Sequence, residues 1–282
     1  MMKQSSMLLV AGLIIIGIVG AGQKRSDQRM YDLNLGKETS MSKAIGLLEQ
    51  NRIILVGEHH GNKKHHEAQR DVIRALKETG MQVAVGLEMF RSDSQPALDR
   101  WINGDIGEEK FQRIYYDNWN FPWSAYRVIF DYARKEKIPL IGLNVSGDIT
   151  RQVSQHGFKS LSVTQKGKLS DVTCRVDKAY MDYIRNAFGA HAHGNLDFNY
   201  FCEAQLVWDN VMAINTLNYL KKFPDAVVVV LTGMGHAQKG AIPRQIRKRS
   251  QAPLAVVLPE VRESVDPETV TNKDADYIIL DL

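Results

Sequence analysis

Four short apolar segments, each followed by a polar side chain, constrain the fold of this chain most strongly. The segments are rich in β-branched residues and bounded by turn-forming residues, which is typical of strands buried on both faces. The segments and the polar residues that follow them are Arg52–Val56 with Glu58 and His60, Val83–Leu87 with Glu88, Pro139–Leu143 with Asn144, and Ala226–Leu231 with His236.

Helical patterns separate these strands along the chain. Val72, Ile73 and Leu76, for example, form an apolar stripe at helical spacing after the first strand. Strands that alternate with helices predict an α/β fold with a mostly parallel central sheet flanked by helices. Two further strand candidates, Leu254–Leu258 and Tyr277–Leu280, lie near the end of the chain.

The segment from about residue 148 to residue 197 has no strand pattern. It is polar and helix-like, so we expect a small helical insert subdomain, followed by a long helix from about Asn199 to Leu220. Cys174 and Cys202 lie in or beside this insert. They could pair in an oxidising compartment or remain as two buried free thiols, and the sequence leaves both alternatives open.

The first residues predict export. Lys3 precedes an uncharged run from Met7 to Gly22, and Lys24 and Arg25 follow it. A cationic start and an apolar run that ends in small residues are typical of a signal peptide, and an uncleaved membrane anchor is the alternative. We therefore expect an exported protein of the periplasm or cell envelope, in contact with the membrane through this segment. No cysteine follows the run, so a lipobox cysteine is excluded.

The rest of the chain divides into a linker and one domain. Residues 23–40 are polar and predict a linker, and residues 41–282 predict the α/β domain with its insert. The formal charge of +4 and the pI of about 8.9 are only mildly basic. The basic residues are scattered apart from Arg244, Arg247, Lys248 and Arg249, so no nucleic-acid partner is predicted.

The polar residues after the strands predict a site. Ligands of open parallel sheets bind beyond the carboxyl ends of the strands, so we expect these side chains to converge there. The mixture of carboxylates and imidazoles suits zinc, iron or manganese, with His60, His236 and Glu88 as ligands. It also suits acid/base catalysis by Glu58 and Glu88. Each residue alone could equally be a helix cap, a turn residue or an ion-pair partner.

A dense aromatic segment from Tyr115 to Tyr126 could be core, or one wall of a slot for a flat ligand such as haem. Haem needs an axial His or Tyr and basic groups for its propionates. Candidate residues of this kind are Tyr180, Tyr183, Lys178 and Arg185 in the insert, His191 and His193 in a glycine-flanked stretch, and His66 as a contact on the helix after the first strand. Each could also be an ordinary surface or core residue.

Several of these motifs together resemble the ChaN family of haem-binding uptake proteins, within the Tiki superfamily. The resemblance covers roughly residues 45–250 and rests on the order and spacing of the motifs. The motifs are Gly57-Glu58-x-His60 with His65, His66 and Gln69, Gly86-Leu87-Glu88-Met89-Phe90, the Trp119, Trp123 and Tyr126 block, Leu143-Asn144, Gln205 with Trp208-Asp209, and Gly233-x-x-His236.

The resemblance implies an α/β domain with a small helical domain, and a surface or periplasmic protein that binds haem. It also implies a homodimer that encloses a pair of haems, with a tyrosine as iron ligand. Tyr180 is our candidate for that ligand and Tyr183 is the second candidate. Relatives in the superfamily include proposed metal-dependent proteases and erythromycin-esterase-like hydrolases that use the glutamates and the Gly-x-x-His histidines.

Three functions therefore remain after the sequence is read. The first is haem binding in iron or haem uptake, and the second is metal-dependent hydrolysis at the Glu58, His60, Glu88 and His236 cluster. The third is a membrane-anchored interaction module without catalysis. The polar cluster and the haem site need not coincide.

Overall fold

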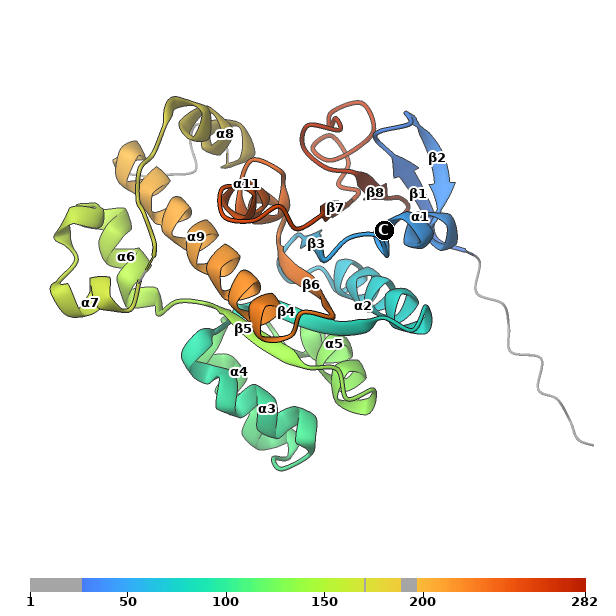
Figure 1. The fold of residues 1–282 in the computed structure, drawn as a ribbon, viewed down its shortest axis with the longest axis horizontal. Coiled ribbons are helices and arrows are strands. Elements are labelled where there is room, and N and C mark those ends of the chain that lie inside the picture. The colour runs from blue at the N-terminus through green and yellow to red at the C-terminus, as the bar shows by residue number, and fades with distance from the viewer. Residues whose placement is uncertain (1–26, 170, 189–196) are drawn as a thin grey trace, which may run out of the picture.

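The computed structural model describes residues 27–169, 171–188 and 197–282. Within these residues, eight strands form one sheet in the order β2-β1-β8-β7-β3-β6-β4-β5 (Figure 1). The strands are β1 (Arg29–Asp32), β2 (Lys37–Ser40), β3 (Ile53–Glu58), β4 (Gln82–Arg91), β5 (Leu140–Asn144), β6 (Ala226–Gly233), β7 (Leu254–Pro259) and β8 (Tyr277–Ile279). All neighbours from β8 to β5 are parallel, whereas β1 pairs antiparallel with both β8 and β2.

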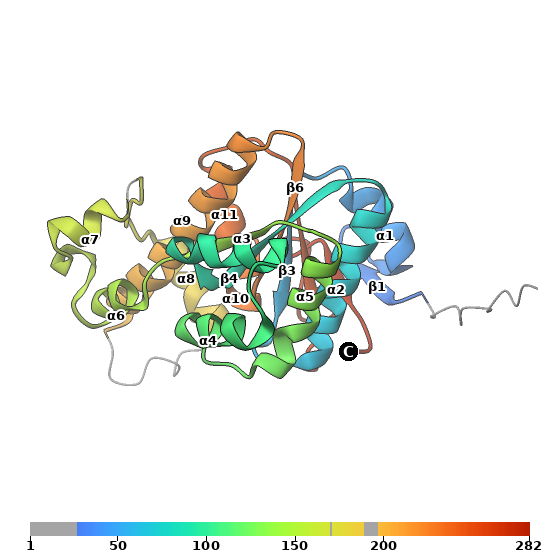
Figure 2. The same ribbon diagram turned by 90° about the horizontal axis from the view of Figure 1, so that it is seen from below.

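Helices cover both faces of the sheet, as Figure 2 shows. Alternate residues of each strand point to opposite faces. In β3, Ile54 and Val56 join the apolar core under one set of helices, and Ile53 and Leu55 join the core under the other. The first set is α1 (Met41–Leu48), α2 (Lys63–Glu78), α3 (Gln95–Asn103), α4 (Glu108–Asn118) and α5 (Trp123–Lys135), and the second is α9 (Phe198–Lys222), α10 (Met234–Ala237) and α11 (Ile242–Arg247). The predicted α/β architecture is confirmed.

The predicted insert is helical. It contains α6 (Gly147–His156), α7 (Val163–Gly167) and α8 (Lys178–Phe188), and within its described residues there is no strand. A small apolar cluster packs α6 against α9, and a second cluster packs Tyr180 and Ile184 of α8 against Cys202 and Leu206 of α9. Both cysteines are free thiols, so of the two alternatives the structure has the unpaired one.

The prediction that residues 23–40 form a linker is wrong for their second half. Residues 29–32 and 37–40 form β1 and β2, and β1 extends the sheet by pairing with β8. Met30 and Asp32 are buried there, and Met30 lies opposite Ile279. The partner strand is near the other end of the chain, so the local polar composition could not reveal the pairing.

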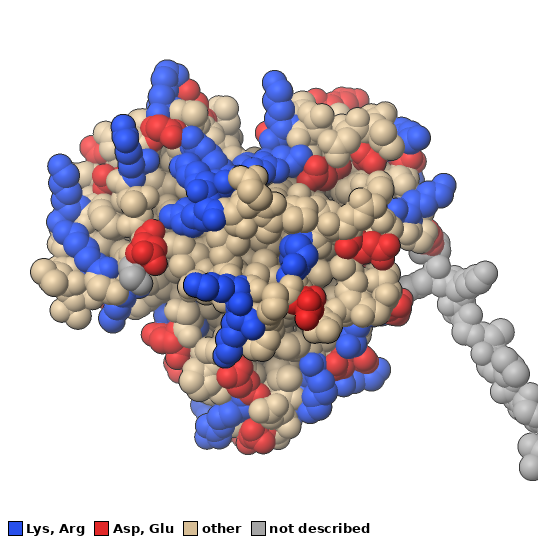
Figure 3. Space-filling model, in the orientation of Figure 1, with Lys and Arg blue, Asp and Glu red and all other residues tan. Residues whose placement is uncertain are grey.

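Lys and Arg gather over the α11 region on the face drawn in Figure 3, and charges of both signs mix elsewhere on that face. Two arginines of this region contact other groups of the protein. Arg244 lies 2.7 Å from a carboxylate oxygen of Asp177, and Arg249 donates to the backbone oxygen of Gln245. In the described part of the chain, no helix combines the length and the apolar character needed to cross a membrane. The predicted signal peptide or anchor at residues 1–22 lies outside the described residues.

One glycine substitution tests the packing of the sheet, and a second substitution in a helix serves as the comparison. A Cβ on Gly142 in β5 would overlap the carbonyl oxygen of Arg91, which belongs to the adjacent β4 backbone. Because backbone cannot move cheaply, we expect Gly142→Ala to lower the free energy of unfolding by about 1–3 kcal/mol. Gly46→Ala in α1 meets open space, and we expect it to stabilise the protein by about 0.5–1 kcal/mol. Urea unfolding of both variants checks this, and equal effects would contradict it.

Candidate functional site

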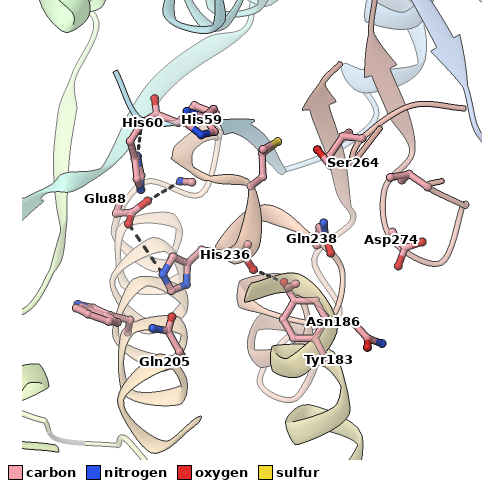
Figure 4. A pocket seen from close by; sticks show the side chains of 18 of the residues that line it. His59, His60, Glu88, Tyr183, Asn186, Gln205, His236, Gln238, Ser264 and Asp274 are labelled. Atoms are coloured by element: carbon pink, nitrogen blue, oxygen red, sulfur yellow. Dashed lines mark hydrogen bonds and ion pairs between the residues drawn. The ribbon is translucent and has the colours of Figure 1, made fainter. Parts of the chain in front are cut away.

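Polar side chains from four strands line one cavity at the carboxyl edge of the sheet. Glu58 ends β3, Glu88 lies near the end of β4, Asn144 ends β5, and His236 follows β6. All four, together with His60, line a cavity of about 880 Å³ (Figure 4). The structure thus brings together the residues that the sequence placed at this edge.

The sheet topology explains why a cavity opens here. After β3 the chain crosses to α2 on one face of the sheet, and after the neighbouring β6 it continues to α10 on the other face. Helices that leave adjacent parallel strands in opposite directions create a crevice at the strand ends. Glu58 and the Gly233–His236 turn lie on the two sides of that crevice.

Glu58 is buried and shared by three side chains. Its Oε1 accepts hydrogen bonds from the Tyr126 hydroxyl (2.6 Å) and from Nδ1 of His60 (2.7 Å). Its Oε2 lies 2.9 Å from Nε2 of His66, although the ring N–H is not aligned for a hydrogen bond. Because Nδ1 of His60 is committed to the carboxylate, Nε2 of His60 is left for the cavity.

The charge of Glu58 is stabilised by these partners. Burial raises the pKa of the carboxyl, but the hydrogen bond from His60 and the close approach of His66 outweigh burial and lower that pKa to about 2. Nδ1 of His66 must donate to the carbonyl oxygen of Ala125 at 2.9 Å, so its Nε2 faces Glu58. His66 therefore stands behind Glu58 and does not line the cavity. Oε1 of Glu58 accepts from Tyr126 and His60, and the buried Oε2 faces His66, which favours a role in positioning His60 over the predicted general-base role.

Glu88 lies between His60 and His236, as Figure 4 shows. Its Oε2 accepts hydrogen bonds from the Thr232 hydroxyl (2.5 Å) and from the Gly233 N–H (2.6 Å). Its Oε1 lies 4.0 Å from Nε2 of His236. A Cβ at Gly233 would lie 2.9 Å from Nε2 of His60, so only a glycine lets this ring come so close.

Asn144 has a structural role at the edge of the site. Its Nδ2 donates to the backbone oxygen of Glu88 at 2.8 Å, and its Oδ1 accepts from the N–H of Val145. The side chain thereby ties the end of β5 to β4, as the turn-residue interpretation of the sequence allowed.

His236 has a carboxylate partner of its own. Its Nδ1 lies 2.6 Å from Oδ1 of Asp209, and Oδ2 of Asp209 accepts a hydrogen bond from the Tyr180 hydroxyl (2.5 Å). Burial lowers the pKa of His236, but the charges of Asp209 and Glu88 outweigh burial and raise it. His60 and His236 are thus each held at Nδ1 by a buried carboxylate.

The sequence did not predict that Asp209, Tyr126 or Thr232 would bind the carboxylates and imidazoles of the site. Asp209 was noted only in a motif of the family resemblance, and Tyr126 was considered only as core or as one wall of a slot for a flat ligand. Asp209 also carried a physical signal, because it is the one acid in an apolar part of the long helix between Leu206 and Met212. An acid at such a position is buried and needs a partner.

Of the four described insert residues that were proposed to hold a cofactor, only Tyr183 lines the cavity. Tyr180 is 1% exposed and its hydroxyl is used by Asp209. Tyr183 lines the cavity, and its hydroxyl donates to the backbone oxygen of Gly235. Lys178 and Arg185 both contact the carboxylate of Asp182. His191 and His193 lie outside the described residues.

Aromatic rings form part of the cavity wall. Trp119 and Phe121 each lie 5.1 Å from the ring of His60, and Trp208 lies 6.0 Å from the ring of His236, measured between ring centres. A second hollow of about 700 Å³ shares Glu88, Asn144 and all three aromatic residues with the cavity. That hollow adds the basic side chains of Arg91 and Arg151 to the region.

The predicted metal ligands His60, His236 and Glu88 all line the cavity. Across residues 27–169, 171–188 and 197–282, however, no three His, Cys, Asp or Glu side chains are arranged so that they could hold a metal ion.

The Glu58 network makes a prediction about acid stability. The folded-state pKa of about 2 lies below the ordinary value of 4.5, so the network stabilises the fold above pH 4.5 and this stabilisation is lost as the pH falls toward 2. We expect Glu58→Gln to lose roughly 3 kcal/mol of this pH-dependent stability, so that its unfolding free energy varies less over that interval. Unfolding measured across this pH range checks the prediction, with exposed Glu109→Gln as the control. A Glu58→Gln profile parallel to the wild type would contradict it.

Comparison with known proteins shows the family. The family model for haem-binding uptake proteins, Tiki superfamily, ChaN, matches residues 44–246. A solved structure entitled cofacial haem binding to ChaN of Campylobacter jejuni is 21% identical, with a TM-score of 0.71 over 91% of this chain and 97% of that chain. An erythromycin esterase mutant in its open conformation is 14% identical, with a TM-score of 0.49 over 77% of this chain and 72% of that chain. Comparison with curated proteins finds no match. The chain belongs to the ChaN family of the Tiki superfamily.

Proposed function

We propose that this protein binds haem in the cavity at the carboxyl edge of the sheet. The observation that carries the proposal is the pair of imidazoles, His60 and His236, which both line the cavity and are each held at Nδ1 by a buried carboxylate. Histidines that bind iron or other metals commonly have this arrangement. Membership of a haem-binding family supports the same function.

The cavity also has the other features that haem needs. Its volume of about 880 Å³ is in the range of cofactor sites, and Trp119, Phe121 and Trp208 offer apolar walls to a flat ring. Arg91 and Arg151 of the adjoining hollow could pair with the propionates. Bound haem would supply an iron that takes an imidazole nitrogen as its axial ligand.

The electrostatics of the cavity favour a cationic centre. Oε1 of Glu88 and Nε2 of His236 face each other at 4.0 Å. With Nδ1 donating to Asp209, a neutral His236 directs a lone pair toward this carboxylate. A proton or a bound cation between the two atoms would stabilise the arrangement.

Titration with ferric haem tests the proposal. We expect the wild-type protein to develop a Soret band that saturates at a fixed stoichiometry. The double variant His60→Gln with His236→Gln should weaken haem binding by at least about tenfold, because both imidazoles that could bind the iron are lost.

His156→Ala is the matched control, since this histidine is exposed at the end of α6. An unchanged spectrum and affinity in the double variant would place haem elsewhere and overturn this site. A wild-type protein that shows no saturable haem binding would overturn the function itself.

Haem uptake or handling at the cell envelope is the biological role that we propose for this activity. It rests on residues 1–22, whose sequence predicts export and membrane contact. The homodimer implied by the family resemblance is part of the same proposal.

One observation favours hydrolysis as a second candidate. Oε1 of Glu88 faces Nε2 of His236 across a gap of 4.0 Å, and Oε2 is held in place by Thr232 and Gly233. A fixed carboxylate opposite an imidazole can move a proton to or from a water molecule or a substrate bound between them.

Glu88→Gln tests the second candidate. Hydrolysis of ester and peptide substrates is measured with zinc, manganese or iron(II) added and with chelator. We expect any hydrolysis by the wild type to fall by about 10²–10⁴-fold in Glu88→Gln, because the proton acceptor is lost. Exposed Glu109→Gln should keep full activity. A Glu88→Gln variant as active as the wild type would contradict a catalytic role for this site.

A further inference from the structure

Helix α8 of the insert contacts the site through two tyrosines one helical turn apart. The Tyr180 hydroxyl donates to Oδ2 of Asp209, and the Tyr183 hydroxyl donates to the backbone oxygen of Gly235. Asp209 holds the ring of His236, and Gly235 is the residue before His236. The insert therefore acts on His236 at its ring, through Tyr180 and Asp209, and at its backbone, through Tyr183. Figure 4 shows Tyr183 reaching the backbone beside His236.

Helix α8 is itself anchored to the α/β domain. Asp177 at its start lies 2.7 Å from Arg244 of α11 and accepts the backbone N–H of Tyr180 at 2.9 Å. The ring of Tyr183 packs on Gly240, where any Cβ would come within 2.5 Å of the ring. Tyr180 is 1% exposed, so the hydroxyl is held in place and shielded from water.

The bonding at Asp209 determines which nitrogen of His236 carries the proton. A neutral imidazole has one N–H donor and one acceptor nitrogen, and an ionised carboxylate can only accept. Asp209 therefore requires the proton on Nδ1 and leaves the lone pair on Nε2, which faces Glu88. If Asp209 were protonated on Oδ1 it would donate to Nδ1, and the proton of the ring would move to Nε2. The Tyr180 hydroxyl opposes this because its hydrogen bond favours the ionised form.

We propose that Tyr180 and Asp209 are positioning residues that keep His236 in its Nδ1–H tautomer, with Nε2 directed at Glu88. The insert thereby orients His236 for binding, and Tyr180 itself does not bind the iron. This deepens the proposed function, because a tautomer with an unprotonated Nε2 is the one that can bind iron or another metal through that nitrogen. It also gives Tyr180 a role other than that of iron ligand.

Nitrogen-15 NMR of the histidine rings tests the proposal on the ligand-free full chain, in alkaline buffer where the rings are neutral. The wild-type His236 should show the Nδ1–H tautomer. Asp209→Asn can donate to Nδ1 as well as accept from it, so we expect a substantial Nε2–H population. Tyr180→Phe, which is close in shape, should shift the populations in the same direction by a smaller amount. The exposed Tyr200→Phe on α9 is the control and should match the wild type.

Ferric haem titration of the same variants provides the second measurement. We expect Asp209→Asn to weaken haem binding by about 10–100-fold, Tyr180→Phe to weaken it less, and Tyr200→Phe to leave it unchanged. An unchanged His236 tautomer in both Asp209→Asn and Tyr180→Phe would overturn the inference. So would loss of the haem spectrum in Tyr180→Phe alone, because that result would make Tyr180 the iron ligand.

The two measurements separate the inference from the proposed function. The tautomer is observed without any ligand, so it can shift as expected even if the wild-type protein fails to bind haem. That outcome would overturn haem binding and leave the positioning role standing.

Discussion

Glu58 ends β3 where its carboxylate is out of contact with water, and three side chains replace the lost hydration. A buried charge without partners would destabilise the fold by several kcal/mol, so His60, His66 and Tyr126 must be in place whenever the domain is folded. The same contacts orient His60 toward the cavity. Stability and the geometry of the site are therefore coupled at this carboxylate, because one set of hydrogen bonds serves both.

Asp209 does for His236 what Glu58 does for His60, because its carboxylate contacts Nδ1 of the imidazole. It comes from α9 rather than from a strand, and it is stabilised by His236 and by Tyr180 of the insert. The insert and the α/β domain thus share a buried polar network in addition to their apolar contacts. Since buried polar networks specify one arrangement of their partners, we infer that this network fixes the position of α8 against the site.

The sequence predicted the strands β3 to β8, because fully buried strands are continuous apolar runs that can be recognised without knowing their distant partners. It also predicted the polar residues after β3, β4, β5 and β6. It also placed Glu58, Glu88 and His236 at one edge, since parallel strands align their carboxyl ends. It missed β1 and β2, because β1 joins the sheet by pairing with β8, far along the chain, and β2 pairs with β1. It chose Tyr180 as an iron ligand from residue type and from the family resemblance, whereas the structure shows its hydroxyl hydrogen-bonded to Asp209.

Periodicity and residue order by themselves determined the fold class, the helical insert and the set of residues that meet at the cavity. Only the tertiary structure decided which side chains face the cavity and which stand behind them. Glu58 and His60 are two residues apart, yet the side chain of Glu58 is fully buried and that of His60 is 31% exposed. The reason is physical: hydrogen bonding and burial depend on partners such as Tyr126 and Asp209, which are close in space but distant in the chain.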